Sequence, residues 1–159
     1  MRISSENSFI EPCNPTCSFC FLNYSDVLQK NSLFAGMKQE SIGKIIRKIH
    51  HQVKQYSTDE IIAYNGDPYN SLYFIVEGSV VGEIIDFEGK VLRIEELKAP
   101  DTIAGAFLFG DNNRLPVNVR ASGKTRILII PRHDLLKLLR KNEKVLLNYL
   151  NMVCNRTQH

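Results

Sequence analysis

The stretch that decides the fold is residues 62–80, Ile-Ala-Tyr-Asn-Gly-Asp-Pro-Tyr-Asn-Ser-Leu-Tyr-Phe-Ile-Val-Glu-Gly-Ser-Val. A short strand over 61–64 is predicted to enter a turn at Gly66, and an apolar strand over 72–76 is predicted to end at Gly78. Both glycines stand where the backbone requires a positive φ, which glycine adopts at little cost. Closely spaced strands with a glycine at each corner predict a compact antiparallel β-roll.

The β pattern continues beyond this stretch and covers residues 52–131. A second hairpin is predicted to follow at once, with its tip at 86–90. Apolar and polar residues alternate over 92–95 and over 117–121, which predicts strands with one face in water. The continuous apolar run 127–130 predicts a buried strand.

Helices are predicted on both sides of the β region. Residues 38–50 carry four isoleucines at helical spacing, and a short helix is predicted over 133–140. Asn142 is placed to cap a final helix. One side of that helix carries Leu146, Leu147, Leu150, Val153 and Cys154. The predicted fold class is therefore α+β, mainly β: an antiparallel β-roll (double-stranded β-helix or jelly roll) flanked by N- and C-terminal helices.

Length and charge narrow the class of protein. A chain of 159 residues fits one domain with a sizeable core, and its net charge of +3 does not by itself indicate a nucleic-acid surface. No apolar run approaches the roughly 20 residues that a membrane helix needs. Residues 1–12 lack the apolar stretch of a secretory signal. We therefore expect a cytoplasmic protein with no membrane partner.

Four short elements in a fixed order carry a resemblance to a known family: Gly66-Asp67, Leu72-Tyr73-Phe74-Ile75, Gly78-Ser79-Val80 and Gly89. Together they resemble the cyclic-nucleotide-binding sensor domain of the Crp/Fnr superfamily of transcription regulators. The resemblance implies that residues 1–24 form a Cys-containing N-terminal extension and that residues 25–141 form the sensor roll. It also implies that residues 142–159 begin a dimerisation helix.

The same resemblance implies the partners: a small-molecule effector and a second copy of the chain. In the resembling regulators a helix-turn-helix domain follows the dimerisation helix. That domain is absent from this sequence, so DNA is expected to be bound only through it. The chain is interpreted either as a sensor fragment of a longer regulator, which its end inside a helical pattern favours, or as a free-standing ligand-binding protein.

The family's ligand cassette corresponds here to residues 102–117, and it departs from the nucleotide-binding pattern. Gly105 stands where the family has the Glu that takes the ribose hydroxyl, and Leu115-Pro116 stands where it has the Arg-Ser pair for the cyclic phosphate. Each lost charge-assisted hydrogen bond weakens binding by about 1.5–3 kcal/mol. A cyclic nucleotide is therefore the less favoured ligand. The candidate ligand-binding residues are Gly105, Ala106, Phe107, Arg114, Leu115, Pro116 and Val117.

Two alternatives remain for this pocket. Arg114 stands one position early, and a reshaped loop would let it contact the phosphate of a cyclic nucleotide. The sequence of residues 106–117 is also similar to that of the HcpR-like branch, the regulators of hybrid-cluster protein. These regulators respond to nitrosative stress and are associated with haem. That similarity implies a haem, for which the candidate axial ligands by chemistry are His50, His51, His133, Met37 and Met152.

Cys13, Cys17 and Cys20 form a Cys-x3-Cys-x2-Cys array. This spacing is that of radical S-adenosylmethionine enzymes, but the chain is too short for their barrel. A cluster ahead of the roll resembles the iron–sulfur redox sensor of fumarate-nitrate regulators more closely, although the fourth ligand here would be a non-cysteine residue or Cys154. The other interpretations are reactive redox thiols, no special role for the array, and a buried apolar role for Cys154.

No catalytic motif supports an enzyme, because the sequence has no phosphate loop and no Gly-x-Ser-x-Gly. The leading hypothesis is a sensor whose ligand moves the roll against the terminal helix. A ligand-free dimerisation module is the other possibility.

Overall fold

The computed structural model describes residues 10–13 and 24–157, and there the strands form two antiparallel sheets. The first sheet has the order β1 (Ile10–Cys13), β2 (His51–Tyr56), β9 (Thr125–Pro131), β4 (Ser71–Glu77) and β7 (Thr102–Ile103). The second has the order β3 (Ile61–Ala63), β8 (Asn118–Ala121), β5 (Ser79–Ile85) and β6 (Val91–Lys98). The antiparallel β-roll predicted from the sequence is confirmed.

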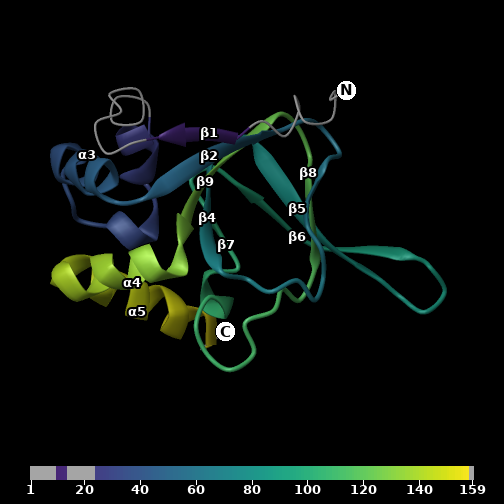
Figure 1. Cartoon of the computed structure of the whole chain (residues 1–159). Coiled ribbons are helices and arrows are strands. Elements are labelled where there is room, and N and C mark those ends of the chain that lie inside the picture. The colour runs from purple at the N-terminus through teal and green to yellow at the C-terminus, as the bar shows by residue number, and fades with distance from the viewer. Residues whose placement is uncertain (1–9, 14–23, 158–159) are drawn as a thin grey trace.

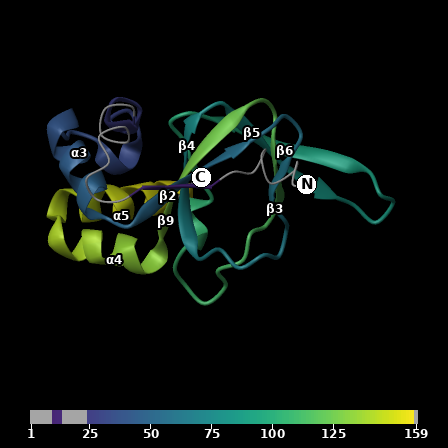
Figure 2. The ribbon, with the colours of Figure 1, turned by 45° about the horizontal axis from the view of Figure 1, so that its top comes forward.

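The helices gather on one side of the roll, as both views show (Figure 1, Figure 2). They are the α-helices α3 (Gln39–Lys48), α4 (Arg132–Lys141) and α5 (Glu143–Thr157), with the short 3-10 turns η1 (Ser32–Phe34) and η2 (Gly105–Phe107). Residues 24–28 are also helical. Asn142 caps α5, because its Oδ1 accepts a hydrogen bond from the backbone N–H of Val145 at 3.0 Å. None of the helices described is long and apolar enough to cross a membrane.

The corners of the roll are built as the sequence predicts. Gly66 and Gly78 both have φ of 91°, in the left-handed region that side chains avoid. Gly78 also lies tightly against the chain that enters β9, since a Cβ atom placed on it would lie 2.3 Å from the carbonyl oxygen of Lys124. The first corner therefore needs only the backbone freedom of glycine, whereas the second needs its small size as well.

Strands β4 and β9 form the centre of the core and are buried on both faces. Phe74 and Leu128 pack into the cluster under the helices, while Ile75 and Ile127 pack into a second cluster inside the roll. The two strands pair with Phe74 opposite Leu128. This two-sided burial explains why the sequence of β9 is a continuous apolar run.

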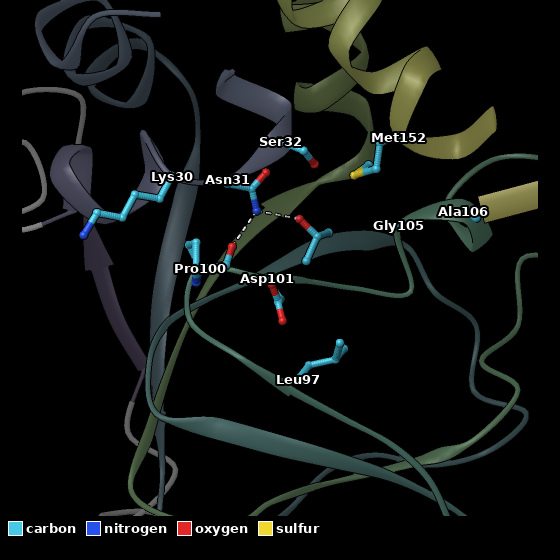
Figure 3. A pocket seen from close by; sticks show the side chains of 10 residues that line it. Lys30, Asn31, Ser32, Leu97, Pro100, Asp101, Gly105, Ala106 and Met152 are labelled. Carbon is cyan, nitrogen blue, oxygen red and sulfur yellow. Dashed lines mark hydrogen bonds between the residues drawn. The ribbon is translucent and has the colours of Figure 1, made fainter. Parts of the chain in front are cut away.

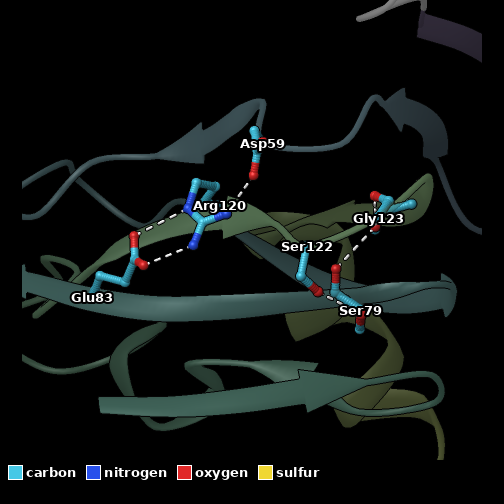
Figure 4. Close-up of polar contacts among 7 residues, drawn as sticks. Asp59, Ser79, Glu83, Arg120, Ser122 and Gly123 are labelled. Atoms are coloured by element: carbon cyan, nitrogen blue, oxygen red, sulfur yellow. Dashed lines mark hydrogen bonds and ion pairs between the residues drawn. The ribbon is translucent and has the colours of Figure 1, made fainter. Parts of the chain in front are cut away.

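A charged network ties the second sheet together on its outer side (Figure 4). The guanidinium of Arg120 on β8 donates to Glu83 on β5, with Nη2–Oε2 2.8 Å and Nε–Oε1 3.2 Å. Its third nitrogen lies 2.6 Å from a carboxylate oxygen of Asp59 in the loop before β3. A Ser79–Ser122 hydroxyl pair at 2.6 Å joins β5 to the end of β8. The network therefore fixes three neighbouring segments of the sheet.

Three features differ from the sequence-based expectations. The strand β6 does not have one dry face: Leu92 and Ile94 are both exposed, because the β5–β6 hairpin extends beyond the roll (Figure 1). Cys154 is exposed on α5 rather than buried. The predicted N-terminal extension contributes a strand, β1, which pairs with β2.

Candidate functional site

The turn η2 follows β7 and lies where the family cassette begins. Ala104, just before it, takes the left-handed conformation with φ of 50°. The hydroxyl of Tyr69 donates to the carbonyl oxygen of Ile103, on the roll side of this corner. The hydroxyl of Tyr149 on α5 donates to the carbonyl oxygen of Gly105 at 3.0 Å. The cassette is thus held by the roll on one side and by the terminal helix on the other.

Both tyrosines are donors throughout the physiological pH range. Burial raises the pKa of Tyr149 to about 12, and it raises the pKa of the more deeply buried Tyr69 further. The sequence pattern did not single out either residue, because the carbonyl oxygens that they bond are distant in the sequence.

The second half of the cassette separates the residues that the sequence grouped together. Arg114 is exposed, and its Nη1 donates to the carbonyl oxygen of Gly66 at 2.9 Å. Leu115 is only 3% exposed and packs in the cluster under the helices. Pro116 and Val117 line a cavity inside the roll. The guanidinium of Arg114 is thus engaged with the turn before β4, outside that cavity.

The roll cavity itself measures about 30 Å³. Its wall is apolar apart from the carboxylate of Glu95, and Phe107 of η2 contributes to it. Such a volume accommodates about one water molecule. A ligand the size of a nucleotide needs roughly ten times more space. The lining residues are Val80, Gly82, Glu95, Leu97, Ile103, Ala104, Phe107, Pro116, Val117 and Val119.

A larger cavity of about 380 Å³ lies on the side of η2 that faces α5 and η1 (Figure 3). Asn31 is a buried polar residue beside it: its Nδ2 donates to Pro100 O and to Thr102 Oγ1, the latter at 2.9 Å. Its Oδ1 accepts from Leu33 N at 2.8 Å. This arrangement joins the N-terminal segment to the loop before η2. The wall consists of Lys30, Asn31, Ser32, Leu97, Pro100, Asp101, Thr102, Gly105, Ala106 and Met152.

Gly105 and Ala106, two of the predicted ligand-binding residues, belong to this second cavity. A Cβ atom on Gly105 would lie 3.0 Å from Met152 Cε and 3.4 Å from Thr102 Cγ2. The missing side chain at position 105 therefore allows α5 to approach η2 closely. The sequence indicated only that position 105 lacks the carboxylate that the family resemblance implies, since contact with a helix far along the chain leaves no local pattern.

The candidate metal ligands are only partly within the described residues. Cys13 ends β1, whereas Cys17 and Cys20 lie outside the described residues. Across residues 10–13 and 24–157, no group of three or more His, Cys, Asp or Glu side chains is arranged to hold a metal ion. The array therefore stays a prediction.

The residues of the roll cavity do not fit a haem. A porphyrin is far larger than the 30 Å³ available, and no histidine or methionine lines this cavity. His50 and His133 are exposed. Met152 lines the second cavity, Met37 packs against the helix-side core, and the buried His51 begins β2.

Comparison with known proteins gives the family. The profile of the cyclic nucleotide-binding domain matches residues 53–142. A transcriptional regulator of Thermotoga maritima is 34% identical, with a TM-score of 0.65 over 67% of this chain and 82% of that chain. A cyclic nucleotide-binding domain from Methylobacillus flagellatus, 18% identical, shares the fold with a TM-score of 0.74 over 99% of this chain and 86% of its own.

Among curated proteins, the cAMP-activated global transcriptional regulator CRP of Salmonella typhimurium is 27% identical over 109 residues, which are 69% of this chain and 52% of CRP. The chain thus spans about half the length of the curated relatives that it matches. It belongs to the cyclic nucleotide-binding domain family, in the form found in Crp/Fnr-type regulators.

Proposed function

We propose that the chain is the effector-sensing part of a Crp/Fnr-type transcription regulator, without enzymatic activity, and that its effector is not a cyclic nucleotide. The relatives named as transcriptional regulators support the first part of this proposal. In this proposal the protein binds DNA only through a DNA-binding domain joined to the sensor. The cytoplasm is the compartment in which such a regulator acts.

One observation carries the proposal about the effector: the roll cavity is small and apolar at the place where the family binds its nucleotide. It measures about 30 Å³, and Pro116 and Val117 form part of its wall. Gly105 supplies no carboxylate, and Arg114 is bonded to Gly66. A cyclic nucleotide would have to open this cavity and would find neither of its two charged partners.

The effector site that we propose is the cavity of about 380 Å³ between η2, η1 and α5. This volume suits a small molecule of metabolite size. Hydroxyl, amide and charged groups in its wall favour a polar ligand, and Leu97 and Met152 give it an apolar side. A ligand here would contact η2 and α5 together, so it would favour one position of the helix over another.

Calorimetry with cyclic AMP and cyclic GMP tests the proposal that the effector is not a cyclic nucleotide. We expect no binding of either nucleotide at micromolar concentrations. Micromolar affinity for either one would overturn the proposal and would favour the rearranged cassette with Arg114 at the phosphate.

A thermal-shift screen of polar metabolites, followed by calorimetry, tests the proposed effector site. A ligand of the proposed cavity should lose its affinity in Ala106→Leu, which fills the cavity, and should keep it in Val117→Leu, which alters the roll cavity. The opposite pattern would place the effector inside the roll and refute the proposed site.

The same function implies a homodimer through α5. Leu147 and Leu150 are 53% and 49% exposed, and with Leu146 they form an apolar stripe on the side of α5 that faces away from the core. A second α5 would cover this stripe as in a two-stranded helical pair. Leu147→Lys should shift the protein to monomers in sedimentation equilibrium, whereas Leu136→Lys on α4, where the side chain is 42% exposed, should not. Equal behaviour of the two variants would contradict this interface.

A further inference from the structure

Another cavity lies between α3 and α4, which are on the same side of the roll (Figure 2). It measures about 380 Å³, within the range of small-molecule sites in proteins. It shares no lining residue with the effector cavity proposed above. The wall consists of Ile45, Lys48, Ile49, Asp134, Lys137, Leu138, Lys141 and Asn142. The two helices therefore enclose a second space of metabolite size.

The deeper part of this wall is apolar. Ile49 and Leu138 are each 9% exposed and belong to the core cluster under the helices. Ile45 is half-buried and packs against the same cluster. A ligand with an apolar body would cover these three side chains and remove apolar surface from water.

The outer part of the wall is basic. Lys137 and Lys141 lie about one turn apart on α4, so they share a face of that helix. Lys48, the last residue of α3, contributes a third ammonium group. All three lysines are exposed, and in the described part of the chain none of them forms an ion pair. With Asp134 as the carboxylate of the wall, its net charge is +2.

Helix capping explains only part of this charge. Lys48 and Lys141 stand in the last turns of their helices, where the negative end of the helix dipole favours a basic side chain. Lys137 stands a turn earlier, and like charges at i and i+4 on a helix repel one another. An anion bound between Lys137 and Lys141 would remove this repulsion.

We propose that this cavity binds a small phosphate ester with an apolar body, and that the phosphate lies between the three lysines. A phosphate monoester carries a charge of about −1.5 to −2 at pH 7, which complements the +2 of the wall. An ammonium group binds phosphate as a compact point charge, whereas planar carboxylates favour the fork of arginine. The described wall contains no arginine. Asp134 is placed to accept a hydrogen bond from a hydroxyl group of the ester.

This inference goes beyond the proposed sensing function and does not depend on it. The effector cavity is lined from η1, η2 and α5, whereas this one is lined from α3, α4 and Asn142, the residue that caps α5. Binding at the two cavities can therefore succeed or fail separately.

Fluorescence titration of the full chain with 1-naphthyl phosphate tests the proposal. The chain contains no tryptophan, so the naphthyl emission is measured against a low protein background. We expect saturable binding of this ester. Inorganic phosphate, added as a competitor, should bind roughly tenfold more weakly or worse, because it lacks the apolar body. The uncharged 1-naphthol should not bind, because it has no group for the lysines.

Variants that remove one charge locate the site. Lys48→Gln on α3 and Lys137→Gln on α4 should each weaken binding of the ester roughly tenfold, the loss expected for one charge-assisted hydrogen bond. Arg140→Gln removes the same charge from an exposed position of α4 outside the cavity and should bind as the parent chain does. Ala106→Leu should also bind as the parent does, because it alters only the effector cavity.

Three results of the titration would overturn the proposal. They are parent-like affinity in both lysine variants, an equal loss in Arg140→Gln, and no saturable binding of the ester by the parent chain. Loss of binding in Ala106→Leu would place the ester in the effector cavity and would overturn it as well.

A phospholipid headgroup carries the same phosphate chemistry and is distinguished in a second arm. Vesicles of phosphatidylcholine with phosphatidic acid are sedimented with the parent chain and with Lys137→Gln. We expect the parent chain to stay in the supernatant, because the apolar contacts of this site lie inside the cavity, which a lipid chain held in a bilayer does not reach. Sedimentation of the parent but not of Lys137→Gln, together with no binding of 1-naphthyl phosphate, would overturn the proposal in favour of a lipid.

Discussion

Replacing Gly78 by alanine should destabilise the protein considerably more than the same replacement of Gly66. The two glycines share a φ of 91°, so the backbone strain that alanine introduces is the same at both. Their surroundings differ: no atom lies within 4 Å of a Cβ placed on Gly66, whereas one placed on Gly78 would lie 2.3 Å from Lys124 O and 2.9 Å from Thr125 Cα. The pair therefore separates backbone conformation from packing.

The magnitudes follow from these distances. A left-handed non-glycine residue costs about 1–2 kcal/mol, which is the whole effect expected for Gly66→Ala. Gly78→Ala adds the overpacking of a rigid backbone contact, about 1–3 kcal/mol more. The gain from a stiffer unfolded chain is equal in both variants and cancels in the comparison.

Urea unfolding followed by circular dichroism measures the difference. With a slope of about 1–3 kcal/mol per molar urea, the midpoint of Gly78→Ala should lie roughly 1 M below that of Gly66→Ala. Equal midpoints with equal slopes would refute the packing role of Gly78 and leave only its conformation to explain the corner.

Three further predictions concern the core, the cassette and the charged network. Phe74→Ala should cost about 3–5 kcal/mol of unfolding free energy, since Phe74 is fully buried, whereas Phe87→Ala at the exposed hairpin tip should change it by less than about 0.5 kcal/mol in the same urea assay. Tyr149→Phe should cost about 0.5–1.5 kcal/mol through the lost bond to Gly105, and Tyr64→Phe, at an exposed position, should cost nothing measurable. The hydrogen bond from Arg120 lowers the pKa of Glu83, so the network stabilises the fold above the ordinary glutamate pKa of about 4.3 and loses that contribution as the pH falls through the lowered pKa. Melting curves are recorded from pH 7 to pH 3 at steps of about one pH unit, and in Arg120→Leu the stability should lack this part of its acid dependence. An unchanged profile would show that the network carries no linked stability.

Local patterns were sufficient for most of the fold. Positive φ at Gly66 and Gly78, the two-sided burial of β9 and the cap at Asn142 all depend on residue types whose physical preference is local. Strand β6 was predicted less well, because alternation cannot distinguish a strand on the core from a strand in a projecting hairpin whose apolar side chains are left in water. Strand β1 was missed because a four-residue strand carries too little pattern of its own.

The geometry of the candidate site followed much less from the sequence, for a different physical reason. The cassette was located through the family resemblance, but its residues separate in space: Leu115 lies in the core, Arg114 points to the turn at Gly66, and Val117 lies inside the roll. Only the three-dimensional path of the loop determines these directions. The partners that hold the cassette, Tyr69 and Tyr149, are distant in sequence and were not predicted.

Gly105 connects the cassette with the position of the terminal helix. A side chain at this position would need the space that the methyl group of Met152 occupies 3.0 Å from the ideal Cβ position. A larger side chain at position 105 would therefore require the side chain of Met152 to move. Because Tyr149 of α5 is bonded to the carbonyl oxygen of the same glycine, a shift of η2 acts on the helix through a direct hydrogen bond. The glycine thus leaves room for a short contact route from the cassette to α5, on the side of η2 where the larger cavity lies.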